Sequence, residues 1–356
     1  MNAWVCARSS LLAVLLGCAH RSPVVPPVDA SAPTPPVELV ALIELPRSDA
    51  TEGLSGTQFD PSTRTLLAVQ DKAPRVVPLQ ASSDYRSWTI GTPIELRGRA
   101  ESAWDGEAIA RAGDELFVVA AESHARIERF TLAGVYRALL PVPEHFAHAR
   151  TNKGLEALAA SPSGKYLFFA NEAALESDGA LATRDVGTCV RIGRRELRGE
   201  RYEERFYRSD PLAPAGSDDG EMGVSDLAAL SDHELLVLER GYQPGYGNTA
   251  RIFHTDFADL PVRIDTERPT LYKTLLADLG ALAAPGISHP APQPNPVLEN
   301  YEALSIGPRL SDDRTLLFVT SDDNARAEQR ARILVLAVRI HPAARVVPAA
   351  ALHADP

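Results

Sequence analysis

The feature that most constrains the fold of this chain is a pattern of residues that occurs five times in the same order. Each copy begins in a segment of small residues, continues with an apolar run that ends in an acid, and then reaches Arg-Ile or Arg-Val. The apolar runs end at Asp71, Glu122, Glu172, Glu239 and Asp322. Repeats of this kind are supersecondary units that stack on their neighbours, so the pattern predicts a repeat architecture.

Each unit is predicted to be an antiparallel meander of four strands. The first strand carries small side chains, the second is apolar throughout, as expected of a strand buried on both faces, and the third begins with the arginine. Four-stranded units repeated every roughly 50 to 75 residues are typical of a β-propeller. We predict an all-β fold with a single propeller of five blades. A sixth, degenerate blade within 173–225 or 253–300 is the alternative.

The two ends of the repeat array predict how the ring closes. The fifth copy has no fourth strand after 332–340, whereas 37–45 is a strand without a copy of its own. If these segments pair, the N-terminal strand completes the last blade and no open sheet edge is left between the blades.

The N-terminus resembles a bacterial export signal with a lipobox. A short apolar run ends in Leu15-Leu16-Gly17-Cys18, and in such signals the cysteine is acylated and the preceding peptide removed. The alternative is an ordinary signal peptide with a chance cysteine. By analogy with lipoprotein sorting, Ala19 favours the outer membrane, so we expect a lipoprotein of the cell envelope that contacts the membrane only through its anchor.

The resulting domain organisation has four parts. Residues 1–18 are the lipoprotein signal peptide, and 19–37 form a tether rich in Pro, Ser and Ala. Residues 38–342 are the propeller domain, and 343–356 are a C-terminal tail.

Composition excludes several function classes. The net charge of −11 and the pI near 5.4 argue against nucleic-acid binding, which depends on Lys and Arg contacts to phosphates. Only Cys189 lies beyond residue 18, so there is no disulfide scaffold. The chain also has no phosphate-binding loop motif, no dinucleotide-binding fingerprint and no Gly-x-Ser-x-Gly motif.

The repeated charges are predicted to gather at one mouth of the central channel. The start of strand one, the end of strand two and the start of strand three of a meander lie at the same edge. The first-strand acids, predicted to form an inner ring, are Glu52, Glu107, Glu156, Asp226 and Glu302. The second-strand acids given above would stand beside them. The arginines further out are Arg75, Arg126, Arg191, Arg251 and Arg332.

Two interpretations of these charges stay open. In the structural one, each blade repeats an acid–arginine pair that ties strands two and three together. In the functional one, the carboxylates hold a cation, and hard oxygen ligands favour Ca²⁺ over Zn²⁺. The candidate metal ligands are the five inner acids together with Asp322, and the inner acids are also the candidate catalytic residues. Lys72, Lys153 and Arg240 lie next to ring acids in the sequence and are the candidates for binding an anionic substrate group.

Three segments resemble the bacterial phytase-like domain, a family labelled "esterase-like activity of phytase". The first is Glu52-Gly53-Leu54-Ser55-Gly56, and the second is Val224-Ser225-Asp226-Leu227 leading to Glu239-Arg240-Gly241. The third is Asn300-Tyr301-Glu302-Ala303-Leu304 leading to Asp322-Asp323-Asn324. The resemblance covers about 40–340 and implies an exported propeller with phosphoesterase activity. Propeller phytases, which are similar in architecture, use several Ca²⁺ ions at the mouth.

These observations lead to three functional hypotheses. The first is a Ca²⁺-dependent phosphoesterase or esterase that acts at the channel mouth on a small anionic or ester substrate. The second is a Ca²⁺-dependent lactonase or arylesterase that uses the same acids. The third is a propeller without catalytic activity that binds a protein or glycan. In each case we expect a monomer.

Overall fold

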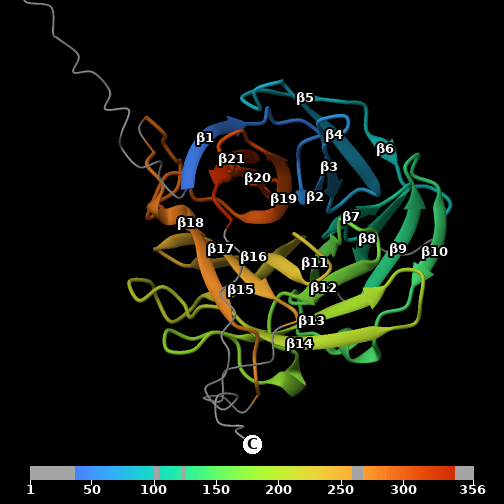
Figure 1. Ribbon diagram of the computed structural model, residues 1–356. Helices are drawn as coiled ribbons and strands as arrows, with labels where there is room; N and C mark the ends of the chain where they lie inside the picture. The colour runs from blue at the N-terminus through green and yellow to red at the C-terminus, as the bar shows by residue number, and fades with distance from the viewer. Residues whose placement is uncertain (1–36, 100–103, 122–124, 259–267, 285, 341–356) are drawn as a thin grey trace, which may run out of the picture. The chain divides into compact units, whose positions relative to one another are not determined.

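The computed structural model describes residues 37–99, 104–121, 125–258, 268–284 and 286–340. Its sheets form five blades around a central channel, so the prediction of a five-bladed β-propeller is confirmed (Figure 1). Apart from the strands, the described residues contain three short 3₁₀ helices, η1 (Glu144–His148), η2 (Glu176–Asp178) and η3 (Leu279–Ala281).

Four blades are consecutive meanders. Blade 1 contains β2 (Leu54–Asp60), β3 (Thr65–Gln70), β4 (Arg75–Ala81) and β5 (Trp88–Ile90), with β6 (Ile94–Glu95) also paired to β4. Blade 2 contains β7 (Ile109–Ala112), β8 (Glu115–Ala121), β9 (Arg126–Thr131) and β10 (Tyr136–Leu140). Blade 3 contains β11 (Leu155–Ala160), β12 (Tyr166–Asn171), β13 (Cys189–Glu196) and β14 (Tyr202–Arg208). Blade 4 contains β15 (Glu221–Ala229), β16 (Glu234–Gln243), β17 (Gly247–Asp256) and β18 (Lys273–Asp278).

The fifth blade closes the ring in the predicted way. Strands β19 (Tyr301–Arg309), β20 (Thr315–Ser321) and β21 (Arg332–Val338) are followed outward by β1 (Val37–Glu44) from the start of the propeller. β1 runs antiparallel to β21, from the pair Val37–Val338 to the pair Glu44–Arg332. The last blade therefore joins both ends of the domain through backbone hydrogen bonds.

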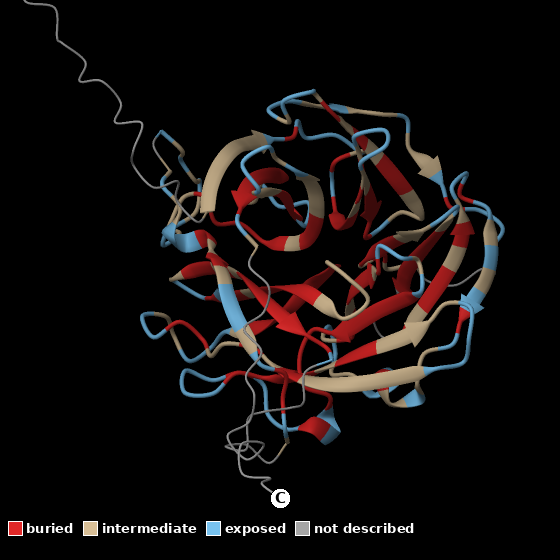
Figure 2. Cartoon of the chain, in the orientation of Figure 1, coloured by how far each residue is buried: buried red, intermediate tan, exposed pale blue. Residues whose placement is uncertain are grey.

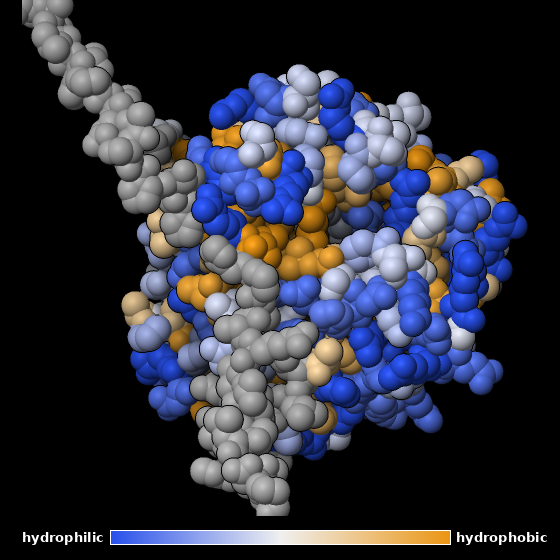
Figure 3. All heavy atoms as spheres, in the orientation of Figure 1, coloured by the Kyte–Doolittle hydropathy of each residue, from blue (hydrophilic) through white to orange (hydrophobic). Residues whose placement is uncertain are grey.

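The hydrophobic core is divided among the contacts between neighbouring blades. Five separate clusters of buried side chains each join two adjacent blades; the one between blades 3 and 4, for example, contains Phe168 and Val237. In Figure 2 the strands near the channel and in the middle of the blades are buried, and the outermost strands are largely intermediate or exposed. Figure 3 shows hydrophilic residues over most of the same view, with hydrophobic ones around the central opening. The uniformly apolar second strands of the repeats thus form the contacts between blades.

Glycine is required at points where the innermost strand of one blade approaches the backbone of the neighbouring blade. A Cβ atom on Gly56 would lie 2.4 Å from the Ala108 Cα, and one on Gly223 would lie 2.4 Å from the Glu172 carbonyl oxygen. Real Cβ atoms do not approach backbone this closely, which explains the small residues on the first strand of each repeat. Of the described helices, none has the length and apolar character needed to cross a membrane.

Blade 4 differs from the sequence-based expectation. The sequence Arg240-Gly241-Tyr242, followed by further Gly and Tyr residues, predicts a flexible loop over the mouth. Instead these residues lie in β16, which pairs with β15 on one side and with β17 on the other. The hairpin of β16 and β17 turns at 244–246, so the backbone of this segment is fixed by ladder hydrogen bonds.

Candidate functional site

A cavity of about 490 Å³ lies at the channel mouth to which the second strands of the repeats point. Nine carboxylates and four cationic side chains are among the described residues that line it, which gives a net charge of −5 with His289 neutral. The carboxylates are Asp71, Asp105, Glu107, Glu156, Glu172, Glu221, Glu302, Asp322 and Glu328. The cations are Lys72, Lys153, Arg240 and Arg326. A strongly acidic mouth was predicted from the repeats, although its members differ in part.

Bulges in the first strands turn side chains toward this cavity. In blade 3 the register shifts between Leu155 and Ala157, so that Glu156 is the additional residue, and in blade 5 Glu302 is in the same position. A bulge adds a residue to one strand and changes the direction of its side chain, which is why bulges are common beside functional sites. Glu107 is in the corresponding place just before β7, where its N–H donates to the Val119 carbonyl oxygen.

The same register shows that the prediction for blade 4 is wrong by one residue: Asp226 does not correspond to the first-strand acids of the other repeats. The bulge of blade 4 lies between Val224 and Asp226, so Ser225, not Asp226, corresponds to Glu156 and Glu302. Successive residues of a strand face opposite sides, so a shift of one residue exchanges the two faces. Asp226 is accordingly absent from the cavity lining. It is buried, and its carboxylate accepts hydrogen bonds of 2.8 Å from the N–H groups of Leu227 and Leu304.

The shift also affects the second-strand position of blade 4. In three blades the acid after the second strand donates its backbone N–H to a carbonyl oxygen just before the first strand; these acids are Asp71, Glu172 and Asp322. In blade 4 the residue paired at this position, opposite Gly223, is Arg240. Arg240 therefore takes the place that an acid occupies in three other blades. Glu239 faces the other side, where it is 1% exposed and accepts hydrogen bonds from the Tyr207 hydroxyl and Lys273.

Another predicted acid, Glu52, is not part of this cavity. Glu52 is exposed in the turn before β2 and lines a separate cavity of about 290 Å³ together with Asp71 and Lys72. In blade 1 the bulge lies between Leu54 and Thr57, and Ser55 lines the main cavity. Glu122 lies outside the described residues. Of the five predicted inner acids, Glu107, Glu156 and Glu302 thus come together, and Glu52 and Asp226 do not.

In the four blades whose second-strand acid is described, the repeated arginine pairs with other acids. Arg75 contacts Asp49, and Arg251 contacts Asp210 and Asp278. Arg191 contacts Asp178 and Glu204, and Arg332 contacts Glu44 and Glu299. In blade 2, Arg126 contacts Glu128. The repeated acid–arginine pair of the structural interpretation is therefore absent from these four blades among the described residues.

Arg240 and Lys153 are held inside the carboxylate ring. The Arg240 guanidinium lies 3.3 Å from Glu172, 3.2 Å from Glu221 and 3.5 Å from Glu302. The Lys153 Nζ lies 2.8 Å from Glu172 and 2.6 Å from Glu221. Burial lowers the pKa of both cations, but the surrounding carboxylates outweigh it and raise it. Both side chains are charged and already engaged by carboxylates.

Two carboxyl groups of the mouth hold protons more tightly than usual. Burial raises the pKa of Glu302, and Glu172 and Asp71 raise it further, whereas Arg240 and the Asn300 amide lower it. Burial also raises the pKa of Asp322 well above its ordinary range, and the charge of Glu302 adds to the effect. A raised pKa makes these two groups better candidates for a proton donor than for a proton acceptor.

The described side chains do not form a ready metal site. Among them, no three carboxylate, imidazole or thiol groups lie close enough to hold one metal ion. Amide oxygens are also Ca²⁺ ligands, and Asn300 and Asn324 line the cavity. The acids are nevertheless spaced by Arg240 and Lys153, so the placed side chains do not fit the predicted carboxylate cage.

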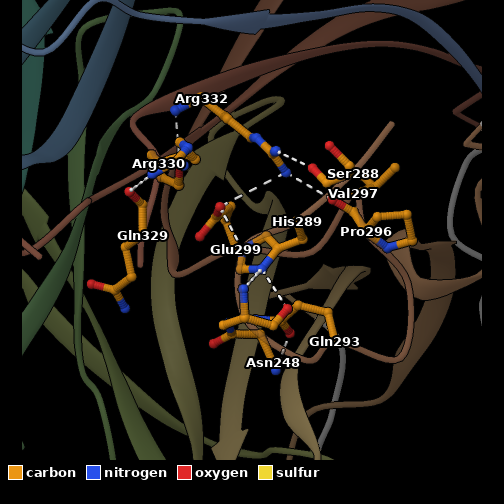
Figure 4. Close-up of polar contacts among 12 residues, drawn as sticks. Asn248, Ser288, His289, Gln293, Pro296, Val297, Glu299, Gln329, Arg330 and Arg332 are labelled. Atoms are coloured by element: carbon orange, nitrogen blue, oxygen red, sulfur yellow. Dashed lines mark hydrogen bonds and ion pairs between the residues drawn. The ribbon is translucent and has the colours of Figure 1, made fainter. Parts of the chain in front are cut away.

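Sequence reasoning missed a buried histidine–glutamate pair at the cavity wall. His289 lines the cavity, its Nε2 lies 2.7 Å from a Glu299 carboxylate oxygen, and both side chains are at most 3% exposed (Figure 4). Gln293, from the same loop, accepts a hydrogen bond from the Asn248 N–H of β17. His289 and Glu299 lie outside the five repeat copies, so the repeat pattern could not indicate them. Glu221 was also missed, because the acidic run at 218–221 is equally typical of a solvated loop.

Five antiparallel sheets around a carboxylate-lined mouth define the protein as a β-propeller with a candidate site at the end of its channel. The family model of the phytase-like proteins, described as esterase-like activity of phytase, matches residues 49–325. The match spans well over half of the chain, and the protein belongs to this family. The resemblance noted in the sequence is thereby confirmed.

Solved structures with a similar fold are distant. The endo-arabinase from Bacteroides thetaiotaomicron is 10% identical, with a TM-score of 0.46 over 82% of this chain and 96% of that one. The nidogen/laminin complex is 11% identical, with a TM-score of 0.40 over 82% of this chain and 86% of that one. None of the curated proteins compared with the chain matches it significantly. Nothing about activity follows from such distant likeness.

Proposed function

We propose that the protein hydrolyses an ester at the mouth of its propeller channel and that a lipid on Cys18 tethers it to the bacterial cell envelope, with the outer membrane favoured. The observation that carries the activity is the placement of three first-strand carboxylates, Glu107, Glu156 and Glu302, in one cavity at the channel mouth. The family match supports this reaction class, because its description names an esterase-like activity.

Hydrolysis at this site needs a proton donor and a proton acceptor. Glu302, whose pKa is raised by burial, would protonate the leaving oxygen. An ionised carboxylate, Glu156 or Glu107, would take a proton from the attacking water. The bond from the water oxygen to the acyl or phosphoryl centre forms, and the bond from that centre to the leaving oxygen breaks. At the end Glu302 has lost its proton to the leaving oxygen, and the other carboxylate has gained one from the water.

The charge of the substrate decides whether the proposed hydrolysis needs the predicted Ca²⁺. A phosphoester is anionic, and the lining carries a net charge of −5 in which Lys153 and Arg240 are already paired. A phosphoester would therefore require an added cation such as Ca²⁺ to enter, whereas an uncharged lactone or aryl ester would not. The pairing of these two cations favours the second candidate function, a lactonase or arylesterase.

The test is a turnover assay with a phosphoester, an aryl ester and a lactone, each with Ca²⁺ and with a chelator. Glu302→Gln keeps the shape of the side chain and removes the proton donor, and we expect turnover to fall by roughly 10²- to 10⁴-fold. Glu95→Gln is the matched control, since Glu95 is exposed on the outer part of blade 1. Equal turnover by Glu302→Gln and the control rejects Glu302 as the acid.

The same assay separates the candidate functions. Phosphoester turnover that needs Ca²⁺ and falls with Lys153→Gln supports the first, and lactone or aryl ester turnover that survives chelation supports a Ca²⁺-independent form of the second. A protein that turns over none of the three substrates and shows no heat of Ca²⁺ binding in calorimetry is a binding propeller for a protein or glycan, and the hydrolase proposal is then wrong.

A further inference from the structure

The cavity at the mouth has more negative charge than its own cations neutralise. Lys72 lies 3.1 Å from Asp71 and 3.0 Å from Asp105, and Lys153 and Arg240 are engaged by Glu172, Glu221 and Glu302. Three of the four lining cations therefore already have at least two carboxylate partners each. A ligand that enters brings its charge into a field in which an anion is repelled and a cation attracted.

A second observation, independent of the carboxylates, indicates a ligand with hydrogen-bond donors. Ser55 lines the cavity and is 1% exposed, and its Oγ has no hydrogen-bond partner among the described residues. Buried hydroxyl groups nearly always have a partner, because leaving one unsatisfied costs about 1–3 kcal/mol. Ser55 stands at the bulge of blade 1, where blades 3 and 5 have Glu156 and Glu302.

The spacing of the lining groups distinguishes between kinds of cation. A single metal ion needs several ligands at one point, and no three acidic, imidazole or thiol groups of the described residues meet this requirement. A quaternary ammonium is bound by a cage of aromatic rings, and Tyr242 is the one Phe, Tyr or Trp among the described lining residues. A primary ammonium has three N–H donors, which a hydroxyl and the two oxygens of a single carboxylate can accept without a second or third acidic ligand.

We propose that the cavity at the channel mouth binds a primary ammonium group and that the physiological ligand carries one. Ser55 Oγ and the carboxylate of Glu156, at the first-strand bulge of blade 3, accept its hydrogen bonds. Tyr242, 45% exposed at the rim, covers the apolar part of the ligand. This inference rests on the proposed function in one respect, because both place the ligand in the same cavity. If both hold, the substrate is an ester that carries a primary ammonium group.

The test is calorimetry of the full-length protein with cadaverine, a diamine with two primary ammonium groups. Pentanediol is the uncharged probe of the same chain length, and Ca²⁺ is the probe of the same charge. We expect cadaverine to bind, pentanediol not to bind, and Ca²⁺ to bind more weakly than cadaverine. Ser55→Ala and Glu156→Gln should each weaken cadaverine binding about tenfold or more, since a hydrogen bond to a charged group contributes about 1.5–3 kcal/mol. Glu95→Gln should leave it unchanged.

Several results would overturn the inference. They are the absence of cadaverine binding at millimolar concentration, equal binding of cadaverine and Ca²⁺ with the same response to the variants, and an unchanged affinity in Ser55→Ala. The small Ser55→Ala change keeps the test decisive if Glu156→Gln fails to fold. Ester turnover without cadaverine binding rejects this inference alone, and cadaverine binding without turnover rejects the proposed hydrolase alone.

Discussion

The replacement Arg240→Met tests whether the mouth depends on its internal cation. Methionine retains much of the length of the arginine side chain and removes the charge. Two of the three carboxylate partners are shielded from water, because Glu172 is 4% and Glu302 18% exposed, whereas Glu221 is 41% exposed. Removing one member of a buried ion pair costs about 3–5 kcal/mol, since the other charge is left uncompensated. The exposed contact to Glu221 adds little to this figure.

The assay is thermal unfolding followed by circular dichroism. A loss of 3–5 kcal/mol corresponds to a decrease in Tm of roughly 5–15 °C for a domain of this size. Arg309→Met is the matched control, because Arg309 and its partner Asp313 are 71% and 78% exposed at a separation of 3.1 Å. Surface pairs of this kind contribute about 0–1 kcal/mol, so the control should change Tm by only a few degrees at most.

The pH dependence provides an internal check of the reasoning. Burial raises the pKa of Glu302, so the folded state binds more protons than the unfolded state above pH of about 4. Stability therefore falls as pH rises through the folded pKa, and loss of Arg240 makes this fall steeper. The deficit of Arg240→Met should be larger at pH 8 than at pH 5. A Tm within 1 °C of the control at pH 8, or a deficit that does not change with pH, would refute the account.

Three further predictions concern other parts of the chain. Asp226→Ala should destabilise the domain by about 2–4 kcal/mol in urea unfolding, because two buried backbone N–H groups lose their acceptor; an unchanged midpoint would show that Asp226 has no such role. Gly56→Ala should lower Tm by several degrees, since the added methyl group meets the Ala108 backbone at 2.4 Å; a Tm equal to that of the unaltered protein would contradict this packing. Cys18→Ala should abolish incorporation of radiolabelled palmitate in growing cells, and continued labelling would rule out Cys18 as the lipidation site.

The fold could be predicted from the sequence because the blades are copies. Five apolar second strands at matched positions identified the blades, and the unpaired strand at the N-terminus predicted the closure that the pairing of β1 with β21 confirms. The side-chain contacts of Glu299 and His289 could not be predicted in this way. Both lie in the loop between blades 4 and 5, outside the repeated pattern, so no copy in another blade indicates that they pair with each other.

The sequence by itself determined that acids gather at one mouth of a five-bladed ring, because strand order and strand direction fix which edge the repeats share. Only the tertiary structure decided which acids face the cavity. A one-residue bulge in the first strands of blades 1, 3, 4 and 5 sets the direction of the side chains. In blade 4 it moves Asp226 into the core and brings Ser225 and Arg240 to the positions of acids elsewhere. The mouth therefore has an internal guanidinium among its carboxylates, and its remaining negative charge favours a cationic ligand.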